Sequence, residues 1–350
     1  MCKKVMVAIS GGVDSSVAAA LLKQKGYTLC GATMNLLPNT DNSDESSVTS
    51  DAALVAAKMG FKHFVFDFKD EFKRCVIDKF IDSYMCAKTP NPCIECNKNL
   101  KFSKMLSQAR ELGYNYIATG HYAQIEFDEK SGRYLLKKAA DESKDQTYVL
   151  YTMTQDELCH TIFPLGSYTK AQVRGMANTL GLITAQKPDS QDICFIPDGD
   201  YAAFIEKNIS QKIEHGDFVD TDGNVLGRHS GITNYTIGQR KGLGITFGEP
   251  RYVIAKDAKT NTVTLGKHEQ LFSDKLCACD ANWIMFDDLT KPMKVYAKAR
   301  YKQPAVPATI VPLGSGRVEC NFDEPQRAFA SGQSVVFYDG DYVVGGGVIE

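Results

Sequence analysis

The chain has 350 residues, 43% of them hydrophobic, and a formal net charge of −2 at pH 7. This length supports two or three domains with buried cores. The small net charge excludes a globally basic nucleic-acid-binding protein, so nucleic acid would have to be bound by local patches of Lys and Arg. No apolar run approaches the roughly 20 residues that cross a membrane as a helix.

The N-terminus and the cysteines predict a cytoplasmic protein. Met1-Cys2-Lys3-Lys4 leads directly into a strand pattern with no signal peptide before it. The eleven cysteines are odd in number, which indicates a reducing compartment and argues against a disulfide framework. The cysteines are then core residues, metal ligands or catalytic groups.

The first predicted unit is a strand, a glycine turn and a helix. An apolar strand pattern over 5–9 leads into Ser10-Gly11-Gly12-Val13-Asp14-Ser15-Ser16 and a helix that ends at Gly26. Backbone N–H groups at a helix N-terminus bind phosphate, and glycine lets the main chain approach it closely. The lysine of a Walker-type loop is absent, and Asp14 is expected to face a Mg²⁺ ion on the phosphates instead. The alternative is an ordinary Gly/Ser turn.

Strand and helix patterns alternate over the first 120 residues. This alternation predicts an α/β fold, a doubly wound parallel sheet whose ligands lie beyond the C-terminal ends of the strands. The phosphate loop and Thr119-Gly120-His121 both follow strands at such an end. The predicted strands are 5–10, 28–34, 63–68 and 116–119, and the predicted helices are 15–25, 51–59, 71–85 and 97–112.

Basic residues recur at helical spacing in the last of these helices. They are Lys98, Lys101, Lys104 and Arg110. We favour a solvated helix face for them over a phosphate-binding surface.

A hairpin over 124–137 and a helix over 170–180 follow, and after about Ala202 the pattern becomes β. The Asp222-Gly223 turn and alternating apolar residues from about Lys275 predict hairpins and a small barrel. We therefore expect three domains: a catalytic domain over 1–201, a small central domain over 202–274 and an all-β, barrel-like domain over 275–350.

Two segments carry cysteines with a chemical context. In the first, two prolines are expected to hold residues 89–96 extended, with a helix beginning near Asn97. Cys96 would then lie at a helix N-terminus, where the dipole and Lys98 lower a thiol pKa, so Cys96 is a candidate nucleophile. The second segment, Ser190–Pro197, contains Cys194. A single CxxC pair is only a weak zinc signal, Cys30 and Cys75 fit core positions, and Cys86 is assigned to structure rather than function.

An ATP site and reactive cysteines together indicate a reaction type. Splitting ATP into AMP and pyrophosphate activates a carbonyl oxygen as its adenylate, which a nucleophile can then displace. The cysteines suggest that this nucleophile is sulfur.

Eight segments carry a resemblance to a known family, the bacterial tRNA-specific 2-thiouridylases. The segments are AISGGVDSS (8–16), TPNPCIECNKNLKF (89–102), ATGHYA (118–123), KDQTYVL (144–150), SQDICFI (190–196), GRHSGITNYTIGQRKGLGI (227–245), ARY (299–301) and GQSVVFY (332–338). The resemblance runs from about residue 4 to the C-terminus.

The resemblance implies adenylation of the C2 oxygen of the wobble uridine in tRNAs for Lys, Glu and Gln. Cys194 would receive sulfur as a persulfide from a sulfur-carrier protein or a cysteine desulfurase, and Cys96 would release it through a transient disulfide. The implied ATP-binding positions are Ala8, Ile9, Ser10, Gly11, Gly12, Val13, Asp14, Ser15, Met34 and Gly120. The implied tRNA and target-base positions are Asn91, Pro92, Cys93, His121, Lys144, Asp145, Gln146, Arg300, Tyr301 and Gln333.

One position departs from the family pattern. Many members carry an Asp, a proposed acid/base residue, where this chain has Cys93. A second mechanism stays open here, because Cys93, Cys96 and Cys194 could hold three irons of a [4Fe–4S] cluster and leave one iron for hydrosulfide.

Two other functions remain as alternatives. A pyrophosphatase-loop amidotransferase or ligase would leave the cysteines and the β module unexplained. A non-catalytic tRNA-binding protein would not need Ser10, Asp14, Cys96 and Cys194 together.

Overall fold

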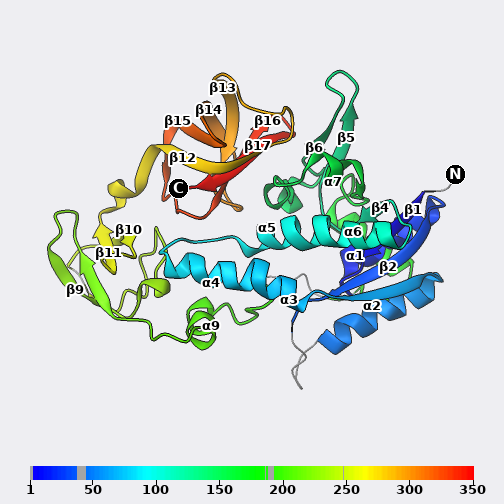
Figure 1. Ribbon diagram of the computed structural model, residues 1–350, viewed down its shortest axis with the longest axis horizontal. Helices are drawn as coiled ribbons and strands as arrows, with labels where there is room; N and C mark the ends of the chain where they lie inside the picture. The colour runs from blue at the N-terminus through cyan, green and yellow to red at the C-terminus, as the bar shows by residue number, and fades with distance from the viewer. Residues whose placement is uncertain (1–2, 38–44, 186, 188–192, 247) are drawn as a thin grey trace.

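The computed structural model describes residues 3–37, 45–185, 187, 193–246 and 248–350. Three β-sheets follow one another along the chain, and Figure 1 shows them as a parallel sheet, a small central sheet and a barrel. Within the described residues, no helix is both long enough and apolar enough to cross a membrane.

The N-terminal sheet is parallel, with strand order β3-β2-β1-β4-β7, as the alternating pattern predicts. Its strands are β1 (Lys4–Ala8), β2 (Thr28–Asn35), β3 (Lys62–Asp67), β4 (Tyr116–Ala118) and β7 (Thr161–Ile162). β1 lies in the middle and is buried on both faces: Val5 and Val7 face one hydrophobic core and Met6 faces the other. The loop after β1 therefore opens at the centre of the sheet's C-terminal edge.

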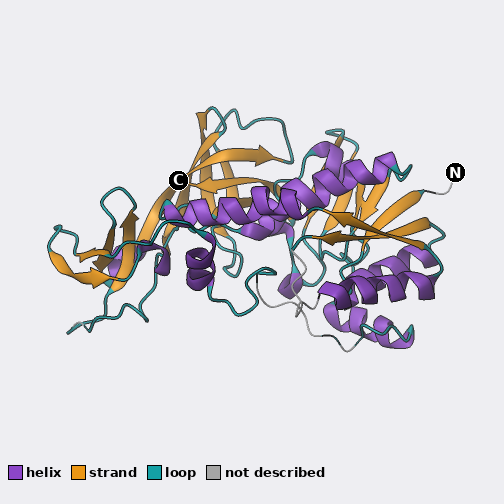
Figure 2. Cartoon of the chain, turned by 60° about the horizontal axis from the view of Figure 1, so that its bottom comes forward, coloured by secondary structure: helices purple, strands orange, loops and turns teal. Residues whose placement is uncertain are grey.

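Helices cover both faces of this sheet (Figure 2). On the Val5 face lie α1 (Val13–Gln24), α2 (Glu45–Met59) and α8 (Lys170–Thr179). The Met6 face packs against two nearly continuous helical runs. The first comprises α3 (Lys69–Phe72), the π-helical segment η1 (Lys73–Ile77) and α4 (Asp78–Met85); the second comprises α5 (Pro92–Cys96), the π-helical segment η2 (Asn97–Lys104) and α6 (Met105–Glu111).

The central domain is a four-stranded sheet of order β10-β11-β8-β9. Its elements are α9 (Tyr201–Asn208), β8 (Gly216–Val219), β9 (Val225–His229), the short 3₁₀ turn η5 (Ile232–Asn234), β10 (Tyr252–Asp257) and β11 (Thr262–Gly266). Gly223 adopts φ +85° in the predicted Asp222-Gly223 turn between β8 and β9. A small core that includes Phe218 and Val253 holds this sheet together.

The C-terminal domain is a closed, six-stranded antiparallel barrel, because β12 pairs with both β15 and β17. Its elements are η6 (His268–Leu271), β12 (Phe272–Trp283), β13 (Met293–Lys298), β14 (Val306–Gly314), β15 (Arg317–Arg327), β16 (Ser334–Asp339) and β17 (Tyr342–Ile349). Closure leaves the six strands without a free edge. β12 runs across residues 274 and 275, where the sequence places the start of this domain.

The hairpin of β5 (Gln124–Asp128) and β6 (Arg133–Lys137) extends the barrel sheet, although it belongs to the first part of the chain. β6 meets β17 at the pair Tyr342–Lys137. The remaining short elements between the hairpin and α8 are η3 (Glu142–Lys144), η4 (Thr147–Val149) and α7 (Gln155–Cys159).

Candidate active site

The predicted phosphate loop lies between β1 and α1. Gly11 has φ +67°, a conformation that favours glycine, and Gly12 is the extended N-cap of α1. Gly12 has no side chain to cap the helix, so the N-terminal turn faces the loop with backbone groups. This arrangement favours an anionic ligand at the loop.

Serine hydroxyls hold the loop in shape. The Ser15 and Ser16 hydroxyls donate to the Gly12 carbonyl at 3.2 and 2.8 Å, and the Ser10 backbone N–H donates to Ser15 Oγ at 3.2 Å. The loop is thus constrained by its own side chains before any ligand arrives.

Gly120 brings the end of β4 against this loop. A Cβ atom added at Gly120 would lie 2.7 Å from Ser15 N and 2.8 Å from the Asp14 carbonyl carbon, which is too close for any side chain. Met34 lies near the end of β2 and is half-buried, and Ala8 ends β1. The predicted nucleotide-binding residues thus come together at one edge of the sheet.

Lys170, which the sequence analysis did not select, reaches this edge from α8. Its Nζ lies 2.8 Å from both carboxylate oxygens of Asp14, and the Tyr122 hydroxyl donates to Asp14 Oδ1 at 2.9 Å. The Lys170 side chain is only 12% exposed. The loop motif has no lysine of its own, but the fold brings a lysine from a distant part of the chain to the loop. The only sequence signal was a Lys directly after Thr169, at a predicted helix start.

The cysteine segment differs from the prediction. The helix begins at Pro92, with Asn91 as N-cap accepting a hydrogen bond from Cys93 N at 3.1 Å, and it continues through Cys96 into η2. Proline fits the first position of a helix because its missing N–H needs no partner there. Cys93, not Cys96, is therefore nearer the helix N-terminus.

The predicted low pKa of Cys96 is also wrong. Burial raises the pKa of Cys96, and the basic residue that acts on it is Lys101, not Lys98. Lys101 favours the thiolate, but burial outweighs it. Lys104 and Arg110 pair at 2.8 Å with Glu71 and Asp156, and Lys98 acts on Glu157. Of the four basic residues on this helix, Lys101 is the one whose charge lowers the thiol pKa values.

The structure brings Cys93, Cys96 and Cys194 together. Burial, together with the neighbouring Cys96 and Cys93 thiols, raises the pKa of Cys194 to about 12. Cys96 is buried, whereas Cys93 and Cys194 keep exposed surface although protein encloses them on most sides. All three are free thiols, and they are largely protonated at neutral pH in this conformation. Ser190, Gln191 and Asp192 of the second segment lie outside the described residues.

Tyr301 connects the barrel to this thiol group. Its ring is 39% exposed, and the nearby Asp145 carboxylate and Cys93 add to the burial that raises its pKa. The Tyr301 hydroxyl lies 3.4 Å from the Asp145 carbonyl, and Lys298 Nζ lies 5.6 Å from the Tyr301 ring centre. A partly exposed aromatic ring near free thiols is suited to stacking on a nucleic-acid base.

The other predicted tRNA positions have different surroundings. His121 is buried between Phe102 and Phe163, and burial lowers its pKa well below the usual value, so it is neutral. Asp145 accepts from Ala139 N and the Thr147 hydroxyl, and burial raises its pKa. Lys144 is half-buried, and Gln146 accepts a hydrogen bond from Tyr122 N.

The two remaining positions join parts of the molecule. Arg300 donates to the carbonyls of Ile237 and Ala328, which links the barrel to the central domain. Gln333 Nε2 donates to the Thr89 carbonyl at 2.9 Å. Both side chains therefore have protein partners in this conformation.

A cluster does not fit the described arrangement of thiols. Among the described residues, no group of three or more His, Cys, Asp or Glu side chains is placed to hold a metal ion.

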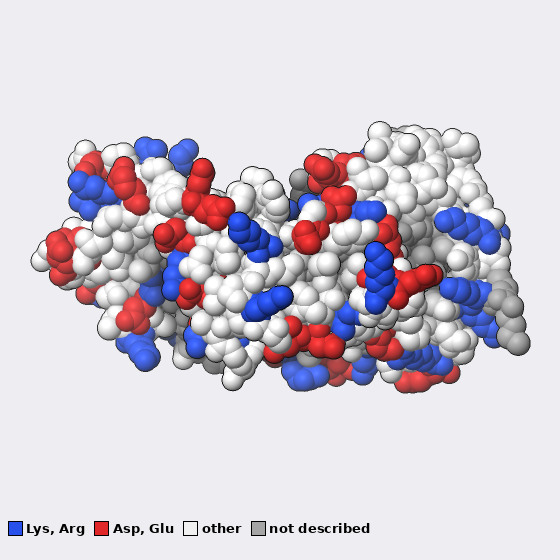
Figure 3. Space-filling model, turned by 90° about the horizontal axis from the view of Figure 1, so that it is seen from above, with Lys and Arg blue, Asp and Glu red and all other residues white. Residues whose placement is uncertain are grey.

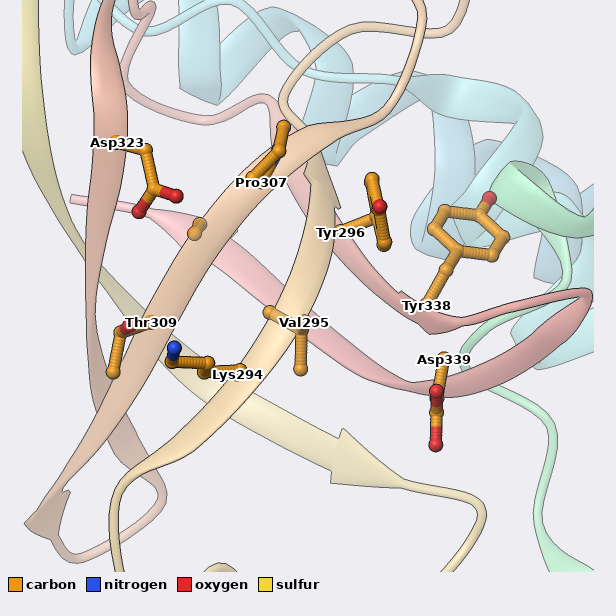
Figure 4. A pocket seen from close by; sticks show the side chains of 9 residues that line it. Lys294, Val295, Tyr296, Pro307, Thr309, Asp323, Tyr338 and Asp339 are labelled. Carbon is orange, nitrogen blue, oxygen red and sulfur yellow. The ribbon is translucent and has the colours of Figure 1, made fainter.

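An open cavity lies elsewhere, on the barrel. It measures about 290 Å³ and lies between β13 and β14, where Lys294, Tyr296 and Thr309 line it (Figure 4). None of its lining residues belongs to the phosphate loop or the thiol group.

Basic and acidic side chains are interspersed on the face shown in Figure 3. A large RNA would thus meet local charges rather than one basic surface on this face.

The fold and the site together define a class of protein. A parallel sheet with a glycine loop at the end of its first strand, next to free thiols, is the site of an α/β nucleotide-binding enzyme that does sulfur chemistry.

Comparison with known proteins identifies the family. Three family models match in order, described as tRNA methyl transferase HUP domain (3–198), tRNA methyl transferase PRC-barrel domain (202–267) and aminomethyltransferase beta-barrel domain (273–349). The tRNA-specific 2-thiouridylase MnmA of Acetivibrio thermocellus is 53% identical over 99% of each chain. That of Clostridioides difficile is 53% identical over 100% of this chain and 99% of its own.

The chain belongs to the tRNA-specific 2-thiouridylase family. It is a sulfurtransferase that uses ATP to thiolate uridine in tRNA, so the amidotransferase and non-catalytic alternatives fall away. The methyl transferase wording belongs to the model descriptions, whereas the full-length relatives are named thiouridylases. A solved structure, the U34-tRNA thiolase NcsA from Methanococcus maripaludis with its [4Fe-4S] cluster, has a TM-score of 0.36 at 18% identity over 59% of this chain and 67% of its own, too slight a likeness to support an inference.

Proposed function

We propose that the chain adenylates the C2 oxygen of the wobble uridine in tRNAs for Lys, Glu and Gln, and replaces that oxygen with sulfur carried on Cys194. One observation supports this most strongly. Gly120 contacts the phosphate loop, its neighbour His121 lies near Lys101, and Lys101 acts on all three thiols. A nucleotide and the sulfur nucleophile would then meet at one place.

In the first step the C2 oxygen attacks the α-phosphorus of ATP, and pyrophosphate leaves. The phosphate loop over 10–15 binds the phosphates through backbone N–H groups and the helix dipole. Asp14 supplies the oxygen ligands that Mg²⁺ prefers, and this ion would neutralise charge on the phosphates when bound. Its carboxylate fits that role once it exchanges its present contacts with Lys170 and Tyr122.

In the second step the terminal sulfur of a Cys194 persulfide attacks C2, and AMP leaves. The Cys96 thiolate then attacks the Cys194 sulfur and breaks the S–S bond, which leaves 2-thiouridine and a Cys96–Cys194 disulfide. A thiol reductant returns both residues to free thiols. During these reaction steps, Lys101 is the group that favours the thiolate form of the cysteines. We place the reaction in a reducing, cytoplasmic compartment, with a sulfur-carrier protein or a cysteine desulfurase as the sulfur donor.

Mass spectrometry of tRNA tests this proposal. The tRNA is incubated with ATP, a persulfide donor and either the wild type, Cys194→Ser or the control Cys277→Ser, which removes a half-buried thiol on the barrel. We expect Cys194→Ser to lose at least 100-fold in 2-thiouridine formation with ATP binding unchanged, because serine cannot carry a sulfane sulfur. Thiolation by Cys194→Ser at the rate of Cys277→Ser would refute the persulfide route.

The purified wild-type protein also distinguishes the persulfide route from a route through an iron–sulfur cluster. Cys93 and Cys96 lie near enough to Cys194 to raise its pKa, but the three thiols as placed do not form a metal site. Anaerobic iron and sulfide analysis with a visible spectrum would give about four irons per chain for a cluster. We expect no stoichiometric iron in thiolation-competent protein.

A further inference from the structure

We propose that Lys170 is the phosphate-binding lysine of this enzyme. Its side chain forms an ion pair with Asp14 in the free protein and moves to the phosphates of ATP or pyrophosphate when they bind. This inference rests on the proposed ATP-to-AMP chemistry and adds a residue to it.

The first support is the geometry of the ion pair. Lys170 Nζ contacts both oxygens of Asp14 at 2.8 Å, and Asp14 belongs to the phosphate loop, in the first turn of α1. Only the Asp14 carboxylate therefore separates the ammonium group from the helix N-terminus that would bind phosphate. The side chain is 12% exposed, which limits screening by water and salt.

The second support is the place of Lys170 in its own helix. It is the first residue of α8, where a positive charge opposes the helix dipole. Asp14, in contrast, already lies at the favourable end of α1 and needs no lysine to be stable there. The interaction with the helix dipoles therefore does not explain why a lysine stands at this position. A ligand at the loop explains its position better.

The third support is the way α8 is fixed. Thr169 and Gln172 form a capping box at its start, and Asp141 accepts a hydrogen bond from the Lys170 backbone N–H at 2.9 Å. Val173 and Ala177 are buried in the same core as α1. The backbone of Lys170 is thus held rigidly, and only its side chain needs to move.

Charge balance explains the exchange. The incoming triphosphate brings several negative charges to a loop that already contains Asp14, so positive charge is needed there. If a divalent cation bound the Asp14 oxygens, Lys170 would lose this ion pair, and its ammonium group could bind a phosphate oxygen through a charge-assisted hydrogen bond. No covalent bond changes in this exchange, and no proton is transferred.

Calorimetric binding of inorganic pyrophosphate, ATP and AMP, with Mg²⁺, tests the inference. We expect Lys170→Met to weaken pyrophosphate and ATP binding about 10- to 100-fold, while AMP binding changes less than threefold. Lys170→Arg should recover part of the loss. The control Lys130→Met removes an equal charge at the exposed tip of the β5–β6 hairpin and should bind all three ligands as the wild type does.

A second variant separates phosphate binding from a structural ion pair. Asp14→Asn removes the group that competes for Lys170, so without Mg²⁺ it should bind pyrophosphate several-fold more tightly than the wild type. Loss of the Asp14 charge favours an anion by itself, so the gain is compared with that of Asp14→Asn made in the Lys170→Met background, where it should largely disappear. A structural role predicts the same gain in both backgrounds. Wild-type pyrophosphate affinity in Lys170→Met, or an equal gain with and without Lys170, would overturn the inference. Wild-type protein that binds neither ATP nor pyrophosphate would instead contradict the proposed function.

Discussion

At the scale of single residues, the site depends on how closely the main chain of β4 approaches α1. A Cβ at Gly120 would lie only 2.7–2.8 Å from backbone atoms of Asp14 and Ser15, and backbone cannot move aside as a flexible side chain can. Its neighbour His121 is buried, so the segment has little freedom to shift.

Gly120→Ala should therefore lower both stability and nucleotide binding. We expect a loss of about 1–3 kcal/mol in the free energy of unfolding and at least tenfold weaker ATP binding, measured by denaturant titration and calorimetry. The matched control is Gly175→Ala in α8, where an added Cβ meets nothing within 4 Å. This control should gain about 0.5–1 kcal/mol because alanine favours helix. Equal effects at both sites would contradict the argument.

At the scale of elements, α8 positions a side chain for a site on a different helix. Its start is fixed by the Thr169 side chain, which accepts a hydrogen bond from Gln172 N, while the Gln172 side chain accepts one from Thr169 N. Losing the cap frays the turn that contains Lys170.

Thr169→Ala should cost about 1 kcal/mol of stability and also weaken pyrophosphate binding severalfold. The same capping box occurs at Thr154 and Glu157 in α7, so Thr154→Ala provides the control. We expect Thr154→Ala to lose similar stability, read as a thermal midpoint, and to bind pyrophosphate normally. Pyrophosphate binding that weakens equally in both variants would show that only global stability matters.

At the scale of the whole molecule, the barrel forms part of the thiol site. The Thr89 N–H donates to the Ser331 carbonyl at 2.8 Å, just before the helix that bears Cys93 and Cys96. Tyr148 of the catalytic domain donates to the Ser334 carbonyl at 2.7 Å. The cysteine segment is thus a helix tied to the barrel, not the extended loop that its prolines predict.

Tyr148→Phe should loosen this interface without changing its shape. It leaves the buried Ser334 carbonyl without this donor, which costs about 1–3 kcal/mol. We expect faster limited proteolysis between the catalytic domain and the barrel, and slower thiolation with ATP binding unchanged. Tyr296→Phe, at a 51% exposed tyrosine of the barrel, is the control. Wild-type proteolysis of Tyr148→Phe would show that this hydrogen bond does not hold the domains together.

The sequence by itself determined the local features. Strand and helix periodicity, glycine turns and caps depend on neighbouring residues, so the parallel sheet, the phosphate loop and the barrel were predictable. The domain boundaries and the roles of individual site residues remain predictions. The fold places Cys93 and Cys96 near enough to Cys194 to raise its pKa, and the roles of the three thiols stay predictions.

Only the tertiary structure decided how distant residues act on one another. Lys170 lies 156 positions from Asp14, and no periodic pattern connects them. The pKa of Cys96 rises because burial by packed elements outweighs the charge of Lys101, and burial is not encoded in a short motif. Electrostatic and packing effects act through space, whereas sequence patterns report only the neighbours along the chain.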